Sequence, residues 1–165
     1  MELFQKISTI VALITLMLVV VRLFLIHKIY KADHERTKKQ STIEYINSIR
    51  QYYKPLEVKL TRKFGKTAVI NLADIDDDIK EDIRELLSVI ENLSTGVNSE
   101  VYDAEIINRM SGSYFINLYK RLQPYIDHAR IRDNNPLYFQ EFEAMINCFK
   151  EMRNTKNTQG DIKYS

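Results

Sequence analysis

An apolar run near the N-terminus constrains this chain more than any other feature. Residues 7–26 read ISTIVALITLMLVVVRLFLI, twenty residues in which Arg22 is the single charged side chain. At about 1.5 Å per residue, a helix of this length is roughly 30 Å long, the hydrocarbon thickness of a bilayer. The run predicts a transmembrane helix, with residues 1–26 as an anchor. A cleaved signal peptide is the weaker interpretation, because no small-x-small cleavage site follows the run.

The charges that flank this run predict an orientation. Five bases follow it within residues 27–40, whereas Lys6 is the one base that precedes it. Cytoplasmic flanks of membrane helices carry the excess of Lys and Arg. The sequence therefore predicts a single-pass protein of the inner (cytoplasmic) membrane, with its N-terminus outside and its C-terminal domain in the cytoplasm.

Residues 27–40 form a basic juxtamembrane stalk in this interpretation. Their bases suit the anionic lipids of the inner leaflet, and Arg22 is close enough to the end of the run for its long stem to reach the headgroups. A pore or partner contact is the alternative for Arg22. Nucleic acid is a weaker partner, since no aromatic or glycine pattern of a nucleic-acid fold follows. The predicted lipid contacts are Arg22, Lys28, Lys31, Arg36, Lys38 and Lys39.

The stretch DIDDDIKEDIRE, residues 74–85, resembles a calcium loop in the spacing of its carboxylates. An EF-hand loop needs glycine at its sixth position, where this chain has Ile79. Apolar residues at three- and four-residue spacing run from Ile75 to Leu93, which predicts a helix instead. The acidic residues then belong to its first turn, where they cap backbone N–H groups and form a surface for a partner. These residues are Asp74, Asp76, Asp77 and Asp78.

Charge is distributed in two blocks around this point. Residues 27–66 hold eleven Lys/Arg against four Asp/Glu, and residues 67–105 hold two against eleven. A basic block followed by an acidic block suggests pairing within the chain or with a second copy, so a protein partner or self-association is expected.

Helical periodicity continues through residues 41–153 and predicts an all-α bundle of about four helices. A capping box, S-x-x-E from Ser41, allows a helix to start or restart at Thr42. Pro55 is expected to kink or end this helix, and Gly65 closes the segment. Helix breaks are predicted at residues 95–96, 111–113 and 134–136. Ser99 is expected to cap the third helix. Pro124 is expected to interrupt an aromatic stripe in the helix after residues 111–113. Residues 154–165 are polar and predicted to be disordered.

Signals for catalysis are weak. The single cysteine, Cys148, lies on the apolar side of the last helix, and the chain has no phosphate loop, H-E-x-x-H or paired-cysteine motif. Asp127, His128, Glu141 and Glu143 could meet as a metal or acid/base cluster, but solvated helix faces explain them equally well. The sequence therefore predicts no catalytic residue, no metal ligand and no cofactor.

Three segments carry a resemblance to a known family. They are STIEYINSIR, ENLSTGVNSEVYDAEIINRMSGSYFINLYKRLQPYI and NPLYFQEFEAMI. Together they resemble an uncharacterised bacterial family, the domain-of-unknown-function family 4760, over residues 1 to about 150. The resemblance implies a membrane-anchored helical domain without an assigned activity, and it transfers no catalytic residues.

These observations together predict a membrane-tethered helical interaction module that is not an enzyme. A small membrane-perturbing effector, in a toxin-like or antiviral role, is the first alternative. An enzyme with an unrecognised helical active site is the second.

Overall fold

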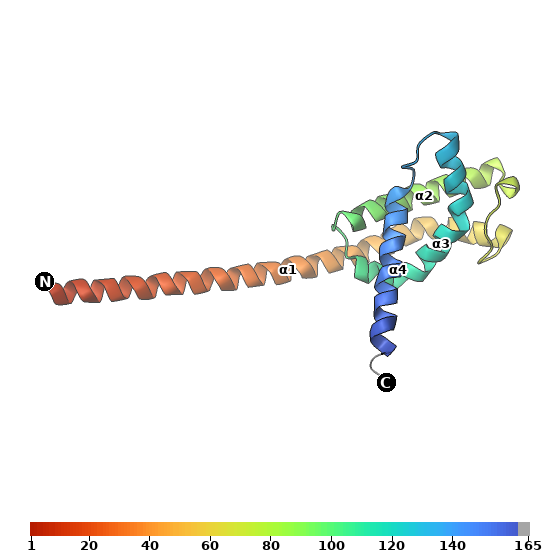
Figure 1. Cartoon of the computed structure of the whole chain (residues 1–165). Coiled ribbons are helices and arrows are strands. Elements are labelled where there is room, and N and C mark those ends of the chain that lie inside the picture. The colour runs from red at the N-terminus through yellow and green to blue at the C-terminus, as the bar shows by residue number, and fades with distance from the viewer. Residues whose placement is uncertain (162–165) are drawn as a thin grey trace. The chain divides into compact units, whose positions relative to one another are not determined.

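The computed structural model describes the backbone of residues 1–161 and the side chains of residues 1, 5 and 14–155. Four α-helices account for most of this part: α1 (Glu2–Phe64), α2 (Asp77–Asn98), α3 (Ala104–Arg132) and α4 (Gln140–Asp161) (Figure 1). A short 3-10 helix, η1 (Leu72–Asp74), precedes α2. No strand occurs in residues 1–161, so the predicted all-α class is confirmed.

The chain divides into two compact units, residues 1–38 and residues 39–165. The first unit consists of the N-terminal part of α1, in which the side chains of residues 14–37 are all exposed. The second unit holds a hydrophobic core that begins at Ile46 and ends at Phe149.

The predicted transmembrane helix is wrong for the described residues. Among the residues with described side chains, no helix contains an apolar stretch long enough to cross a membrane. The side chains of residues 7–13 lie outside the described set. The predicted single-pass topology and inner-membrane location depended on this helix, so they are wrong on the same finding.

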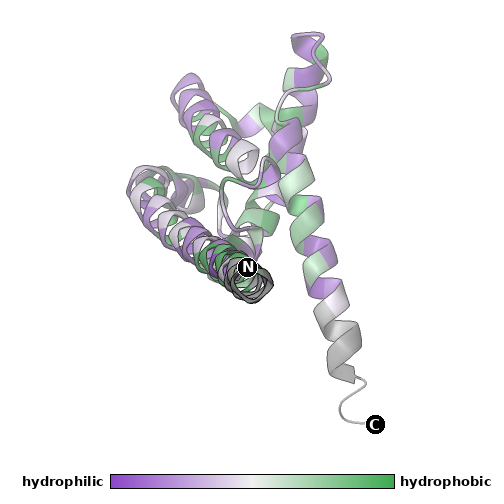
Figure 2. Cartoon of the chain, turned by 90° about the vertical axis from the view of Figure 1, so that its left-hand side faces the viewer, coloured by the Kyte–Doolittle hydropathy of each residue, from purple (hydrophilic) through white to green (hydrophobic). Residues whose placement is uncertain are grey.

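The core of the second unit explains why its helices pack together. Each helix contributes fully buried apolar side chains, as an amphipathic helix must when one face meets its neighbours. Figure 2 shows hydrophilic and hydrophobic residues alternating along the helices. The largest buried side chains are Phe115, Phe142, Phe149, Ile46, Leu60, Ile70, Ile83, Leu86, Leu87, Ile90, Leu93 and Ile107.

The first bundle helix does not start at the predicted capping box. α1 passes through Ser41 without a break, and the Glu44 carboxylate accepts a hydrogen bond from Gln40 Nε2 at 2.9 Å instead of folding back on Ser41. Pro55 also lies inside α1. The predicted end at Gly65 is confirmed, since its φ of +83° suits glycine and its N–H donates to the carbonyl of Thr61.

The predicted acidic helix is confirmed as α2. Asp76 is its N-cap and accepts a hydrogen bond from the N–H of Ile79 at 2.9 Å. The predicted end at Gly96 is wrong, because α2 continues to Asn98. Gly96 serves a different purpose there: a Cβ on it would lie 2.5 Å from the ring of Tyr102, so the absence of a side chain lets the next segment pack closely.

Helix α3 starts later and runs longer than predicted. Its N-cap is Asp103, which accepts from the N–H of Ile106, and not Ser99. The small residues 111–113 and Pro124 do not interrupt it. Gly112 instead makes room for Arg153 of α4, whose guanidinium donates to Asn108 Oδ1 at 2.8 Å and Ser113 Oγ at 2.7 Å.

The turn at residues 134–136 is confirmed, but α4 begins only at Gln140. Asn134 adopts a positive φ in this turn, and Phe139 adopts one directly before α4. α4 extends to Asp161 and so includes part of the predicted disordered tail; residues 162–165 lie outside the described part of the chain.

Candidate functional site

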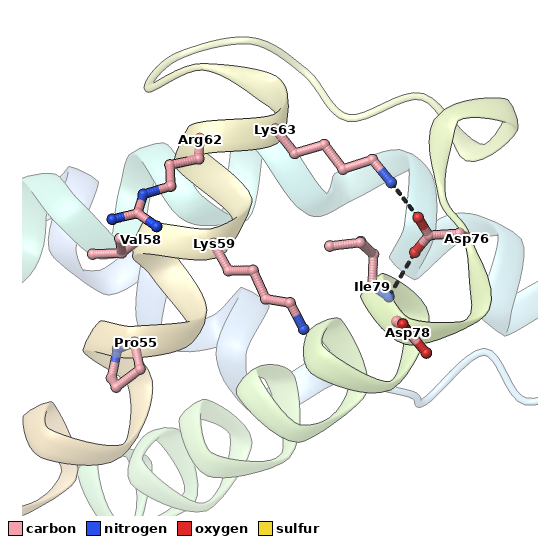
Figure 3. Close-up of a pocket in the computed structure, with 8 residues that line it drawn as sticks. All are labelled: Pro55, Val58, Lys59, Arg62, Lys63, Asp76, Asp78 and Ile79. Carbon is pink, nitrogen blue, oxygen red and sulfur yellow. Dashed lines mark hydrogen bonds and ion pairs between the residues drawn. The ribbon is translucent and has the colours of Figure 1, made fainter.

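An open groove of about 430 Å³ lies between the C-terminal end of α1 and the start of α2. Both elements belong to the second unit. The groove has a basic wall from α1, an acidic wall from the start of α2 and apolar side chains in addition (Figure 3). Its lining residues are Pro55, Val58, Lys59, Arg62, Lys63, Asp76, Asp78 and Ile79.

The basic wall follows from helical spacing. Lys59, Arg62 and Lys63 are three and four residues apart, so the last turns of α1 bring them to one side of the helix. Pro55 and Val58 come one turn earlier on the same side. The result is a strip that is apolar at one end and cationic at the other.

Asp76 connects the two walls. Its Oδ1 accepts the N–H of Ile79 as the cap of α2, and its Oδ2 lies 2.5 Å from Lys63 Nζ. The hydrogen bond from Lys63, followed by that from Ile79, holds the pKa of Asp76 below its ordinary value of 3.8. Asp76 therefore stabilises the start of α2 and its contact with α1, and it is also exposed at the groove.

A second ion pair joins the same helices. Lys59 Nζ lies 2.5 Å from Asp82 Oδ2, and the Asp82 side chain is only 16% exposed. This hydrogen bond with Asp82 raises the pKa of Lys59 above its usual range. The two pairs align the end of α1 with the first two turns of α2.

Two charged residues that line the groove form no ion pair between α1 and α2. Among the described residues, Arg62 and Asp78 take part in none of the ion pairs. Figure 3 shows Arg62 extended over Val58, whereas Lys63 reaches toward Asp76. Each wall thus carries one charge that is outside these ion pairs, positive on α1 and negative on α2.

The four acidic residues predicted as a partner surface are only partly gathered here. Asp76 and Asp78 line the groove. Asp77 lines a different hollow, beside Lys80 and Arg132, and Asp74 ends η1. The predicted partner role of these residues stays a prediction.

The six predicted lipid contacts are spread along α1. Arg22, Lys28, Lys31 and Arg36 are exposed in the first unit, where Lys38 is partly buried. Lys39 is exposed at the start of the second unit. None of the six lines the groove, and their contact with lipid also stays a prediction.

Sequence reasoning missed the exposed apolar face of α1 beside the groove. Tyr52 is 69% exposed and Val58 42% exposed, and Pro55 is exposed between them. With Arg62, these residues recur at three- or four-residue spacing. That spacing is present in the sequence, but proline inside a helix favours a kink or an end, and the lysines stand out only as part of the basic block.

The predicted cluster of Asp127, His128, Glu141 and Glu143 does not assemble as a metal site. Glu143 Oε2 accepts from Arg130 at 2.8 Å, and Glu141 Oε2 accepts from Asn98 at 2.7 Å. No group of three or more His, Cys, Asp or Glu side chains within residues 14–155 could hold a metal ion. Cys148 is partly buried, and this burial raises its pKa.

Comparison with known families gives a match over most of the chain. The model of a family described as a domain of unknown function, DUF4760, matches residues 3–149. The chain belongs to this family. The resemblance inferred from the three segments is thereby confirmed, whereas their bacterial and membrane-anchored associations are not tested by it. Comparisons with curated proteins and with solved structures gave no match.

The segments that resemble DUF4760 meet in the structure. The buried Thr42 Oγ1 accepts the N–H of Asp103 at 2.9 Å, and Tyr45 stacks on Tyr102 with ring centroids 4.5 Å apart. Arg121, almost fully buried, donates to the carbonyls of Gly65 and Ala68. These residues join the helices and loops of the bundle, and none of them lines the groove.

Proposed function

We propose that this DUF4760 chain is a helical interaction module that binds a protein partner through the α1 face beside the groove. The observation that carries the proposal is the exposure of Tyr52, Pro55 and Val58 next to Arg62. Aromatic residues and arginine are enriched in protein interfaces and dominate their binding energy. The buried residues of α1, such as Ile49 and Tyr53, already hold the helix in the bundle, so the outer face is available to a partner.

Photo-crosslinking in living cells tests this proposal. A photoreactive amino acid in place of Tyr52 should give a discrete protein adduct in cells that express the full chain. The same amino acid in place of Lys150, which is exposed on α4, is the matched control. The Tyr52 adduct should be lost when Arg62→Glu is added. Equal adducts from both positions, or none from either, would overturn the proposal.

Tethering to an anionic lipid surface is a second candidate function, favoured by a separate observation. In the first unit the described apolar residues 14–26 are exposed, and exposed bases follow them on the same helix. Exposed apolar side chains next to bases suit contact with acidic headgroups, at about 1 kcal/mol per base near the surface.

Vesicle flotation tests the lipid contact. The full chain should float with vesicles containing anionic lipid and less with neutral vesicles. Replacing Lys28, Lys31 and Arg36 by glutamine should reduce flotation, whereas replacing Arg50, Lys54 and Lys150, exposed in the second unit, should not. Equal losses in both variants would contradict a role for the basic segment. The membrane-perturbing and enzymatic alternatives stay hypotheses.

A further inference from the structure

We propose that a mononucleotide binds between α2 and the C-terminal part of α3, with its phosphate in one hollow and its base in the next. Two hollows of about 280 Å³ and 230 Å³ lie there and share Tyr125 and Arg132 in their lining. Ligand pockets typically enclose about 300–1,000 Å³, a volume that the two hollows reach together. None of their lining residues lines the groove between α1 and α2, so this inference is independent of the proposed function.

Three side chains that can donate N–H groups line the smaller hollow. Lys80 comes from the first turn of α2, and His128 and Arg132 lie one turn apart on α3. An ammonium and a guanidinium donate several hydrogen bonds each, and an imidazole donates at least one in either protonation state. A single arginine fork is enough for a carboxylate, whereas a phosphate has oxygens that accept from several directions. The number of donors therefore favours a phosphate group in this hollow.

The donors of the smaller hollow are available to a ligand. Lys80 takes part in none of the ion pairs among the described residues. Arg132 donates from Nε and Nη2 to the two oxygens of Asp133, both at 2.7 Å, which fixes its guanidinium and leaves Nη1 outside this pair. The lining includes one carboxylate, that of Asp77, against these bases. Positive charge is thus in excess where the phosphate would lie.

The pKa of Asp133, which lines the larger hollow, supports this view of the local charge. The hydrogen bond from Arg132 holds that pKa below its ordinary value of 3.8. The charges of Arg132, Arg84 and His128 also lower it. Positively charged groups from both helices therefore act on one point beside the two hollows, and a phosphate there would be attracted by the same groups.

The larger hollow supplies surfaces for a planar ring. Tyr138 and Phe139 line it with ring centroids 5.9 Å apart, and Arg84 lines it from α2. Bases stack on aromatic rings and on guanidinium planes. Phe139 has a φ of +58°, a conformation that side chains resist and that recurs at ligand sites. In a mononucleotide a ribose separates the planar base from the phosphate, so the two groups can occupy neighbouring hollows at once.

Isothermal titration calorimetry of the full chain tests the site. The probes are AMP and UMP, which carry a purine and a pyrimidine, and inorganic phosphate, adenosine and uridine represent their separate halves. At least one mononucleotide should bind at least tenfold more tightly than inorganic phosphate and than its own nucleoside, because linking the two groups makes the second contact intramolecular. Absence of binding by both mononucleotides, or equal binding of inorganic phosphate, would overturn the proposal.

Substitutions in each hollow locate the binding site. Lys80→Gln should weaken mononucleotide binding at least fivefold, whereas Lys150→Gln, at an exposed position of α4, should leave it unchanged. Tyr138→Leu should also weaken it at least fivefold, and Tyr52→Leu, at an exposed position of α1, is its matched control. Thermal melts of the four variants confirm that they are folded.

The pattern of losses decides between the hollows and general attraction. Losses confined to Lys80→Gln and Tyr138→Leu support a mononucleotide bound across both hollows. Equal losses in Lys80→Gln and Lys150→Gln would show that net charge attracts the nucleotide, and they would overturn the site. A loss in Lys80→Gln without a loss in Tyr138→Leu would overturn the assignment of the base to the larger hollow, and with it the mononucleotide as ligand.

Discussion

At the scale of single residues, the hydrogen bond accepted by the Thr42 hydroxyl gives a direct prediction for stability. Thr42 is fully buried, and its Oγ1 accepts the backbone N–H of Asp103, the N-cap residue of α3. Thr42→Val keeps the shape but leaves this N–H without its partner. We expect the free energy of unfolding to fall by about 1–3 kcal/mol, measured by urea denaturation. Thr37→Val, an exposed position of α1, should change it little; equal effects would contradict the prediction.

The carboxylate of Glu91 caps a helix other than its own. It lies in α2, but its oxygens accept the N–H groups of Glu141 and Phe142 in the first turn of α4, at 3.2 and 2.9 Å. Replacing Glu91 by alanine should destabilise the fold by about 0.5–2 kcal/mol, the range measured for lost N-caps. Glu85→Ala, exposed on the same helix, is the control for urea denaturation. Similar losses in the two variants would show that the cap contributes little.

Glu91 also predicts a dependence of stability on pH. Burial raises its pKa above 4.5, and the two N–H groups offset only part of this rise. A carboxyl group with a higher pKa in the folded state binds more protons when folded, so its contribution to stability falls as pH rises through the window above 4.5. Asp76 and Asp133, whose pKa values are lowered from 3.8, act in a separate window at lower pH.

The variant Glu91→Gln removes this titration. The stability of the original chain minus that of the variant should therefore decrease between about pH 4.5 and pH 7. Urea denaturation at several pH values measures this difference. A difference that rises with pH would contradict the sign of the pKa shift.

At the scale of elements, the contact between α2 and the segment before α3 depends on Gly96. Alanine normally stabilises a helix interior by about 1 kcal/mol relative to glycine. Here a Cβ would lie 2.5 Å from the Tyr102 ring, which stacks on Tyr45, so the ring must move. Gly96→Ala should therefore destabilise the chain by about 1–3 kcal/mol.

A second background makes this prediction specific. In a Tyr102→Ala chain the obstruction is gone, and Gly96→Ala should then stabilise the helix by up to about 1 kcal/mol. Urea denaturation of the four chains measures this change of sign. Destabilisation of equal size in both backgrounds would mean that the ring is not the cause.

The same elements show what sequence reasoning could and could not predict. The apolar stripe from Ile75 to Leu93 predicted α2 because its periodicity and its acidic cap act locally. The predicted cap at Ser99 and the predicted break at residues 111–113 were wrong because distant residues decide both positions. Thr42 holds the backbone of Asp103, which caps α3 instead of Ser99, and Gly112 makes room for Arg153 within an unbroken helix. Tertiary contacts override local preferences at such positions.

The candidate site was predicted only in part, because one of its walls follows from a local pattern and the other depends on tertiary contacts. Its acidic wall was recognised from the four aspartates at the start of α2. Its basic wall was not, because pairing Lys63 with Asp76 requires the path of residues 65–76, which Arg121 fixes from the middle of α3. No local pattern in the sequence contains that information.

At the scale of the whole molecule, the two charge blocks meet within the chain at two points. Lys59 pairs with Asp82 and Lys63 with Asp76, whereas Asp77 and Asp78 take part in none of the ion pairs among the described residues. Exposed ion pairs contribute only about 0–1 kcal/mol each, so the buried apolar side chains must hold the bundle together. The surplus acidic charge is therefore available to influence association.

Replacing Asp76, Asp77 and Asp78 by asparagine should separate these effects. Asparagine caps helices about as well as aspartate, so helicity by circular dichroism should be nearly unchanged. The formal net charge rises from +2 to +5. We therefore expect stronger binding to anionic vesicles in flotation, more so at low salt than at moderate salt, because salt screens charges that are farther apart than about 10 Å at 0.1 M.

A charge-matched variant identifies the cause of any such change. Glu85→Gln, Asp127→Asn and Glu151→Gln remove the same three charges from exposed positions away from the groove. If this variant floats as strongly as the first, net charge alone governs lipid binding. If only the first variant floats more strongly, the acidic turn itself restrains the lipid contact. Unfolding of the first variant would instead show that Asp76 and its pair with Lys63 contribute more to stability than an exposed cap and ion pair should.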